Sequence, residues 1–279
     1  MVKQFTKHSQ TFSIDTASNA AFWNTLEESA WEKETFEVFY KLVNKESVVI
    51  DIGSWEGPFT LFAATLGKKV YAIEPDPVAY KALLNNLEIN PSLKEKIICE
   101  QVALSEKEGT VKLFARNTYG DSAASLLQRS RDSGNEINVA TNTFGNFIHT
   151  NEIKKADFIK MDIEGEEFFI LPGMTNDLKK IELPSLFISF HPKYLQEYFM
   201  KKKISSRFLS KIIFKIANSL GIFLFDKKVK ALFKTCFESL REYQFIYETG
   251  GKNIEPENYL SEKKYQLSNS LLFSIKKIY

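Results

Sequence analysis

The sequence predicts an α/β fold, a mostly parallel sheet with helices on both faces. Short apolar runs of strand length alternate with helix-forming segments along most of the chain, and residues 48–76 contain a complete strand–loop–helix–strand unit. Parallel strands joined by a helix have a right-handed crossover, which defines the topology of this unit. We therefore expect a domain at residues 48–279, with a helical insertion at about residues 194–240, preceded by an arm and helices at residues 1–47.

The composition is that of an ordinary soluble protein. A formal net charge of +2 on 279 residues is too small to predict nucleic acid as the partner. The two cysteines, Cys99 and Cys236, lie far apart without the spacing of a metal site, so we expect reduced thiols in a cytoplasmic protein. The N-terminus lacks the apolar core of a signal peptide, and no stretch is apolar enough to span a bilayer.

The N-terminal region is expected to contain a loose arm, residues 1–15, followed by helices. Between residues 18 and 43, large apolar side chains recur at helical spacing: Phe22, Trp23, Leu26, Trp31, Phe36, Phe39, Tyr40 and Val43. Most of these side chains are expected to pack on the core, as such stripes usually do.

Residues 48–74 have the pattern of a nucleoside-binding unit. An apolar strand ends at Asp51, a loop with two glycines and a helix follow, and a second strand ends at Glu74. Gly53 and Gly57 allow the backbone to approach a ligand closely because they have no Cβ. Glu74 lies about twenty residues after the loop, where an acid can accept both hydroxyls of a ribose. The alternative is a domain in which the two glycines only turn the chain.

The loop itself indicates which nucleoside binds. A dinucleotide site needs the pattern G-x-G-x-x-G, but Gly53 is followed by Ser54 and Trp55, so the second glycine is missing. Asp51 and Glu56 also bring negative charge to the place of a pyrophosphate. An acidic loop suits a ligand with an amino group and a sulfonium, and D-x-G-x-x-x-G resembles the S-adenosylmethionine site of Rossmann-like methyltransferases.

The chain after Glu74 continues the alternation. Pro77 suits the first turn of a helix, and Asp76 can cap that helix. Residues 116–136 are polar and are predicted to form a mobile loop over the ligand face, with Ser122 and Ser125 as contacts, or else a solvated surface loop. The other elements expected here are a helix at residues 78–87, strands at residues 97–104, 111–114 and 137–140, and a short helix at residues 143–148.

The fourth and fifth strands, residues 157–161 and 186–190, are predicted to end at Asp162 and His191. Neighbouring parallel strands lie about 4.8 Å apart and end at one edge of the sheet, so we expect both side chains at the reaction centre, with Glu164 near.

Two roles compete there. His191 could be a general base oriented by Asp162, or Asp162, His191 and a neighbouring acid could hold Mg²⁺ or Mn²⁺. We favour the base. In a third reading His191 only closes its strand before Pro192. Glu166 and Glu167 are explained by the dipole of the helix that follows, predicted to end at Leu171.

Basic and apolar residues alternate in the insertion at residues 194–240. This segment is expected to form a helical lid over the substrate, and the less favoured alternative is a membrane-surface patch within residues 201–234. The last two strands are predicted at residues 243–247 and 271–275.

Four sequence motifs together resemble the FkbM-type methyltransferases, which are S-adenosylmethionine-dependent O-methyltransferases. The resemblance covers about residues 31–190 and rests on VVIDIGSWEG, YAIEPDP followed by LLNNLEIN, VALSEKEGTVKLF and DFIKMDIEGEE. It implies a Rossmann-like class I methyltransferase fold with seven strands, one of them antiparallel at the C-terminal end. Trp55 departs from the family pattern, which has a small or amide residue there. Trp31 and Glu32 precede the first strand, where such enzymes often fold over the cofactor pocket.

The resemblance also implies a function. We expect methyl transfer to a hydroxyl group of a small molecule or glycan, such as a sugar or polyketide, and no nucleic-acid partner. The alternatives are a non-catalytic nucleoside-binding module and an NAD-dependent oxidoreductase. The expected catalytic residues are Asp162, His191 and Glu164. The expected cofactor-binding residues are Asp51, Gly53, Ser54, Gly57, Glu74, Pro75, Asp76, Val102 and Ala103.

Overall fold

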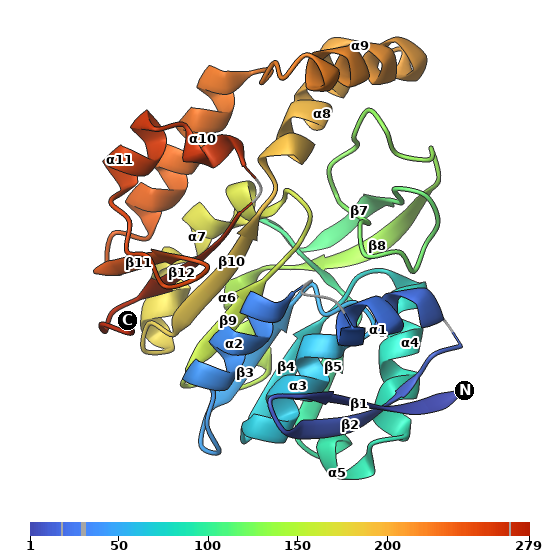
Figure 1. The fold of residues 1–279 in the computed structure, drawn as a ribbon, viewed down its shortest axis with the longest axis vertical. Coiled ribbons are helices and arrows are strands. Elements are labelled where there is room, and N and C mark those ends of the chain that lie inside the picture. Colours follow the sequence, from blue (N-terminus) through green and yellow to red (C-terminus); the bar gives the residue numbers. More distant parts are fainter. Residues whose placement is uncertain (18, 29–31, 268) are drawn as a thin grey trace.

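The structure is a computed structural model, and it describes residues 1–17, 19–28, 32–267 and 269–279. In the described part of the chain the central sheet has seven strands in the order β11-β12-β10-β9-β3-β4-β5 (Figure 1). β12 is antiparallel to both of its neighbours and the other pairings are parallel, which confirms the predicted class I methyltransferase fold. The strands are β3 Val48–Ile52, β4 Lys69–Ile73, β5 Ile97–Glu100, β9 Phe158–Met161, β10 Ser185–Phe190, β11 Phe245–Glu248 and β12 Asn269–Ser274.

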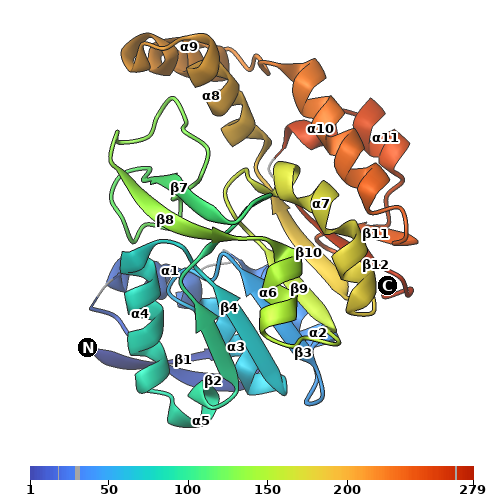
Figure 2. The same ribbon diagram turned by 180° about the vertical axis from the view of Figure 1, so that it is seen from behind.

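Helices cover both faces of this sheet because successive strand residues point to opposite faces. Ile50 and Val49 illustrate this, since they belong to two different buried clusters. Figure 1 shows α2 and α3 in front of the sheet, and Figure 2 shows α6 and α7 on the face behind it. The helices of the two faces are α2 Lys33–Leu42, α3 Pro58–Leu66, α4 Pro77–Glu88 and α5 Pro91–Lys94 on one, and α6 Phe144–Thr150, α7 Glu167–Lys180 and α10 Asp226–Ser239 on the other.

The N-terminal residues form a hairpin, so the prediction of a loose arm is wrong. β1 (Val2–Lys7) and β2 (Gln10–Asp15) pair antiparallel. Asn90 accepts the backbone N–H of Ser13 at 2.8 Å, and Asn86 accepts that of Asp15 at 2.7 Å. These bonds attach the hairpin to α4 and to the turn between α4 and α5, and α1 (Ala20–Glu28) follows the hairpin. The expected contact of Trp31 with the pocket lies outside the described residues.

The predicted third strand is two strands in two different sheets. β5 ends at Glu100, and β6 (Ala103–Leu104) pairs with β8 (Glu136–Asn142), which also pairs with β7 (Gly109–Phe114). The chain therefore leaves the central sheet near Val102 and starts a second, three-stranded sheet. This second sheet carries the 115–135 loop, which joins β7 to β8.

Helix α7 continues past Leu171, where the prediction ended it, through Pro172 to Lys180. Proline has no N–H to donate to the carbonyl of Phe168. The thiol of Cys236, on α10, lies 3.9 Å from this oxygen and donates to it. A partner on a distant helix thus offers the carbonyl a weak replacement bond within the long helix.

The predicted insertion consists of three helices with different surroundings. α10 packs on α7 and belongs to the core through Phe233 and Cys236. α8 (Pro192–Lys203) and α9 (Arg207–Ser219) extend above the sheet (Figure 1). The C-terminal part adds α11 (Pro256–Ser261) and the 3-10 helix at Lys264–Gln266. Among the helices that the structure describes, none has the length and apolar character needed to cross a membrane.

Candidate active site

Gly53 brings the loop after β3 against the end of β9. Its φ is +78°, and a Cβ at this position would lie 1.9 Å from the carbonyl oxygen of Asp162. Any other residue would therefore clash with the backbone as well as adopt an unfavourable conformation. Lys160 donates to the carbonyl of Gly53 at 3.1 Å and strengthens the same junction. The close approach joins the predicted cofactor loop to the predicted reaction centre.

Glu74 lies at the end of β4 and its carboxylate is fixed by backbone donors. It accepts the N–H of Trp55 at 2.8 Å with Oε2 and that of Asp76 at 2.8 Å with Oε1. Burial raises its pKa to about 7. Each carboxylate oxygen retains a further acceptor position, so two hydroxyls of a ligand can be bound.

A first pocket opens in front of Glu74. Five of the predicted cofactor residues line it: Gly53, Glu74, Pro75, Val102 and Ala103. Asp162 and Glu164 line it too, and Asp162 is separated from Glu74 by the end of β3, because the strand order is β9-β3-β4. Asp121, Ser122 and Ser125 of the 115–135 loop also line the pocket. The structure thus brings the predicted adenosine-side residues and the predicted catalytic acids into one cavity.

The remaining predicted cofactor residues are placed differently. Ser54 lines a second pocket, whereas Asp51, Gly57 and Asp76 line neither. Asp51 is buried, accepts the hydroxyl of Thr60 at 2.7 Å and lies 3.4 Å from the Lys160 ammonium. In this structure Asp51 supports the loop from beneath.

The carboxylate of Asp76 connects the start of α4 to the 115–135 loop. It caps α4 through the N–H of Val78 at 2.8 Å and also accepts the N–H of Gly120 at 2.8 Å. The indole N–H of Trp55 donates to the carbonyl of Gly120, also at 2.8 Å. The 115–135 loop is therefore anchored over the pocket at both backbone groups of Gly120. Trp55, which departs from the family pattern, supplies one of the two anchors.

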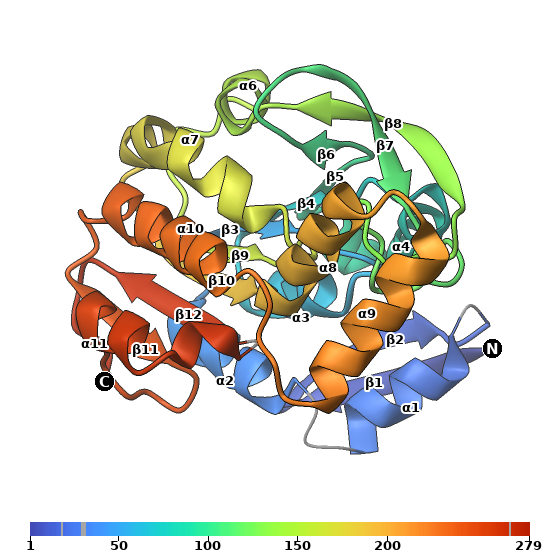
Figure 3. The ribbon, with the colours of Figure 1, turned by 90° about the horizontal axis from the view of Figure 1, so that it is seen from above.

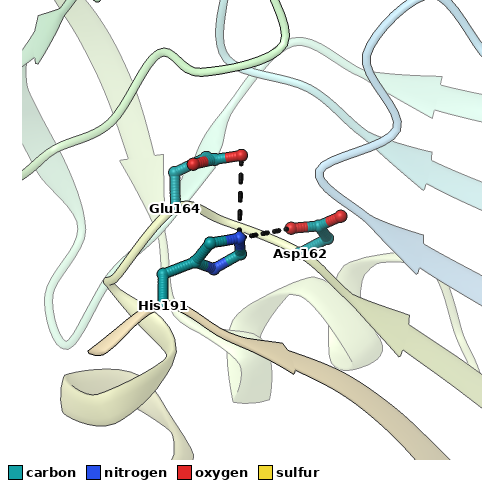
Figure 4. Close-up of side chains that lie close together, drawn as sticks. All are labelled: Asp162, Glu164 and His191. Carbon is teal, nitrogen blue, oxygen red and sulfur yellow. Dashed lines mark ion pairs between the residues drawn. The ribbon is translucent and has the colours of Figure 1, made fainter. Parts of the chain in front are cut away.

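Asp162, Glu164 and His191 lie together, as Figure 4 shows. The Nε2 atom of His191 is 3.5 Å from Asp162 Oδ1 and 3.9 Å from Glu164 Oε1. Asp162 follows β9 and His191 follows β10, which are adjacent parallel strands. Topology alone therefore accounts for this cluster, in which Glu164 is added by the turn before α7.

The Nδ1 edge of the imidazole is held by Glu167, whose role was not predicted. Glu167 Oε1 lies 3.2 Å from His191 Nδ1 and accepts the backbone N–H of His191 at 2.8 Å. Its Oε2 accepts the N–H of Gly165 at 2.8 Å. Glu167 thus orients the ring from the Nδ1 side, while Asp162, expected to orient it, faces Nε2. The spacing of Glu167 in the sequence could have identified it as a buried acid, because it falls on the apolar stripe of α7 with Ile170 and Leu171.

The acids change the protonation of this cluster. Burial lowers the pKa of His191, but the charges of Glu164, Glu167 and Asp162 outweigh burial and raise that pKa to about 10. Burial raises the pKa of Glu164 to about 7. In the ligand-free chain the imidazole therefore carries a proton at neutral pH, and Glu164 changes its charge near neutrality.

The same cluster has the donor set of a metal site. Asp162, Glu164 and His191 each offer one ligand atom, and these atoms lie within 4.8 Å of one another. Asp162 Oδ1 and Glu164 Oε2 have no hydrogen-bond partner among the described residues. Two carboxylates and an imidazole suit several divalent ions. The geometry is therefore compatible with His191 as a general base and also with a metal ion held by the three residues.

A second pocket adjoins the first at the cluster. It shares Gly53, Trp55, Ser122, Asp162 and Glu164 with the first pocket and adds His191. It is also lined by three residues that sequence reasoning did not assign to a substrate: Phe22, Glu32 and Lys160. A lysine within the apolar strand FIKM is the signal that could have identified Lys160. The cluster of Asp162, Glu164 and His191 therefore lies where the two pockets adjoin.

Comparisons with known proteins identify relatives of this chain. The family model of the methyltransferase FkbM domain matches residues 44–211. The hexuronic acid methyltransferase AglP of Haloferax volcanii is 23% identical over 182 residues, which is 63% of this chain and 70% of that protein. The ribosomal protein L11 methyltransferase of Carboxydothermus hydrogenoformans is 40% identical over 83 residues, 29% of this chain and 27% of that protein. Among solved structures, the methyltransferase FkbM from Methylobacillus flagellatus KT aligns with a TM-score of 0.44 at 15% identity, over 85% of this chain but only 50% of that chain.

Proposed function

Because this chain belongs to the FkbM methyltransferase family, we propose that it uses S-adenosylmethionine to methylate a hydroxyl group of a sugar or a similar metabolite. The observation that carries the proposal is the cluster of Asp162, Glu164 and His191 between two adjoining pockets. The first pocket suits the cofactor and the second the acceptor.

The lining of the first pocket fits the cofactor. Glu74 would accept the two ribose hydroxyls, and Val102 and Ala103 would contact the adenine. Asp162 and Glu164, which line the same pocket, would face the positive end of the molecule. When bound, S-adenosylmethionine supplies an electrophilic methyl group, which leaves its sulfur as the acceptor oxygen bonds to it.

The proton of the acceptor would go to the cluster. His191 is charged in the ligand-free chain, but a positive ligand in the neighbouring pocket would lower its pKa again. Nε2 could then accept the hydroxyl proton while Glu167 keeps Nδ1–H oriented. Glu164, whose pKa is near 7, is the second acceptor for that proton. General-base assistance of this kind contributes about 10²–10⁴-fold to the rate.

The acceptor class is supported by the second pocket and by a relative. The pocket combines the apolar ring of Phe22 with the charged groups of Glu32 and Lys160. Such a mixture suits a polyhydroxylated molecule better than a purely apolar one. The relative from Haloferax volcanii is named for a hexuronic acid, which is a sugar of this kind.

The experiment is a methyl-transfer assay with S-adenosylmethionine and a panel of free and glycosidically linked uronic acids and neutral sugars. Mass spectrometry of the products should show a gain of one methyl group per acceptor, located on an oxygen. Turnover of an RNA or protein amine under the same conditions, without any sugar product, would contradict the proposed acceptor.

A further inference from the structure

Helix α9 presents an apolar face to solvent. Its exposed large side chains include Phe208 with 73% and Leu220, just after the helix, with 68% of its surface accessible. Figure 1 shows α9 at the edge of the molecule, above the 115–135 loop and α8. We name this surface the outward apolar face of α9, and it consists of Phe208, Leu209, Ile212, Ile213, Ile216 and Leu220.

This face is distinct from the side of α9 that is buried against the protein. The buried residues of α9 are Ser210, Phe214 and Ala217, spaced so that they lie on one side of the helix. At about 100° per residue, Ile212 and Ile216 project to the other side. The helix therefore has an inner contact with the domain and a second apolar face whose large side chains are 38% to 73% exposed.

The segment around α9 is strongly basic. Residues 198–225 contain no Asp or Glu, although the whole chain has 35 acids against 37 Lys and Arg. Within the helix, Arg207, Lys211 and Lys215 follow one another at intervals of four residues and so form a stripe beside the outward apolar face. The basic residues of the segment are Lys201, Lys202, Lys203, Arg207, Lys211 and Lys215.

We propose that α9 docks on the surface of an anionic lipid bilayer. Its outward apolar face would enter the boundary between headgroups and acyl chains, and the basic stripe would contact lipid phosphates. This arrangement needs no membrane-spanning helix, and α9 with 13 residues is long enough to lie in the interface. A second copy of the chain is a poorer partner, because a symmetric contact would bring two basic segments together.

The position of α9 determines which side of the molecule would face the bilayer. α8 begins directly after His191, which lines the second pocket, and leads to α9. Figures 1 and 3 show α9 at the same end of the molecule as α8. The guanidinium of Arg131, in the 115–135 loop, is 5.2 Å from the ring of Phe214 on α9. A docked α9 would hold the pocket side of the molecule close to the bilayer.

The test is flotation of the full chain with vesicles. Vesicles of phosphatidylcholine and phosphatidylglycerol in equal parts should carry the protein upward at low salt, and pure phosphatidylcholine vesicles should bind it much more weakly. Ile212→Glu together with Ile216→Glu should abolish flotation. Lys211→Gln and Lys215→Gln should each weaken binding to the anionic vesicles about fivefold.

Controls separate this proposal from its alternatives. Leu84→Glu replaces a half-exposed leucine of α4, far from α9, and should float like the unaltered protein. Circular dichroism should show all variants folded, because every altered side chain is on the surface. Protein that stays in the soluble fraction with anionic vesicles at low salt would overturn the proposal. So would a dimer in solution that the two isoleucine substitutions convert to a monomer.

Discussion

Glu167 holds His191 through two atoms. One carboxylate oxygen accepts the backbone N–H of His191 at 2.8 Å and lies 3.2 Å from Nδ1 of the same residue. Glu167 is completely buried, so its carboxylate is shielded from solvent. The ring is thereby fixed with Nε2 toward Asp162 and Glu164. Glu167 is a positioning residue in this account, and its charge helps set the pKa of the imidazole.

Replacing Glu167 by glutamine should move the pH profile of methyl transfer. The charge of Glu167 raises the pKa of His191, so its removal lowers that pKa. A base must be unprotonated, and activity falls when the pH drops below its pKa. The acidic limb of the pH–rate profile should therefore shift to lower pH in Glu167→Gln. Equal loss of activity at every pH, without a shift, would show only a structural role. Glu182→Gln, at an exposed site, serves as the control.

Replacing Glu74 by glutamine should weaken cofactor binding. The substitution removes the charge that would accept the ribose hydroxyls but keeps the side chain's size. We expect a loss of about 1–3 kcal/mol, the range for a hydrogen bond to a charged group. Isothermal titration with S-adenosylhomocysteine measures the change, and Glu88→Gln, an exposed acid on α4, should bind as before. Unchanged affinity in a folded Glu74→Gln protein would refute the assignment.

His191→Ala and Asp162→Asn should reduce turnover and leave cofactor affinity nearly unchanged. Asp162 lines both pockets and His191 lines the second, whereas Glu74, the proposed ribose ligand, lines only the first. Loss of a catalytic group costs about 10²–10⁴-fold in turnover. Single-turnover assays and titrations should be made on the same preparations. Full turnover in His191→Ala would make Glu164 the base, and lost cofactor binding in Asp162→Asn would assign Asp162 to the methionine end.

Chelation distinguishes the base from the metal. With His191 and Glu164 as proton acceptors, dialysis against EDTA should leave methyl transfer intact. If EDTA abolishes transfer and Mg²⁺ or Mn²⁺ restores it, then Asp162, Glu164 and His191 hold a metal that lowers the pKa of the acceptor hydroxyl. A rise in the melting temperature with Mn²⁺, absent in Asp162→Asn, would support that outcome independently of activity.

The parts of the site that follow from topology could be predicted from the sequence. Asp162 and His191 meet because each ends a parallel strand, and the apolar runs that mark those strands are visible in the sequence. Glu74 reaches its pocket for the same reason, at the end of β4. Periodicity and strand order were sufficient in these cases because they determine which edge of the sheet a residue occupies.

The parts that depend on contacts between distant segments could not be predicted. The N-terminal hairpin is attached by Asn86 and Asn90, more than seventy residues away in the chain, and nothing in residues 1–15 marks these partners. Glu167 reads as an ordinary acid of a first helical turn until the fold brings His191 beside it. The attachment of the 115–135 loop at Gly120 likewise forms only when folding brings this loop to Trp55 and Asp76.

The most direct test of the account is a calorimetric titration of the unaltered chain with S-adenosylmethionine, S-adenosylhomocysteine and NAD. The first pocket, in which we propose that Glu74 binds the ribose and that Asp162 and Glu164 face the sulfonium, should bind the first two at one site and should not bind NAD. Binding of NAD in preference to S-adenosylmethionine, or of none of the three, would contradict the central claim.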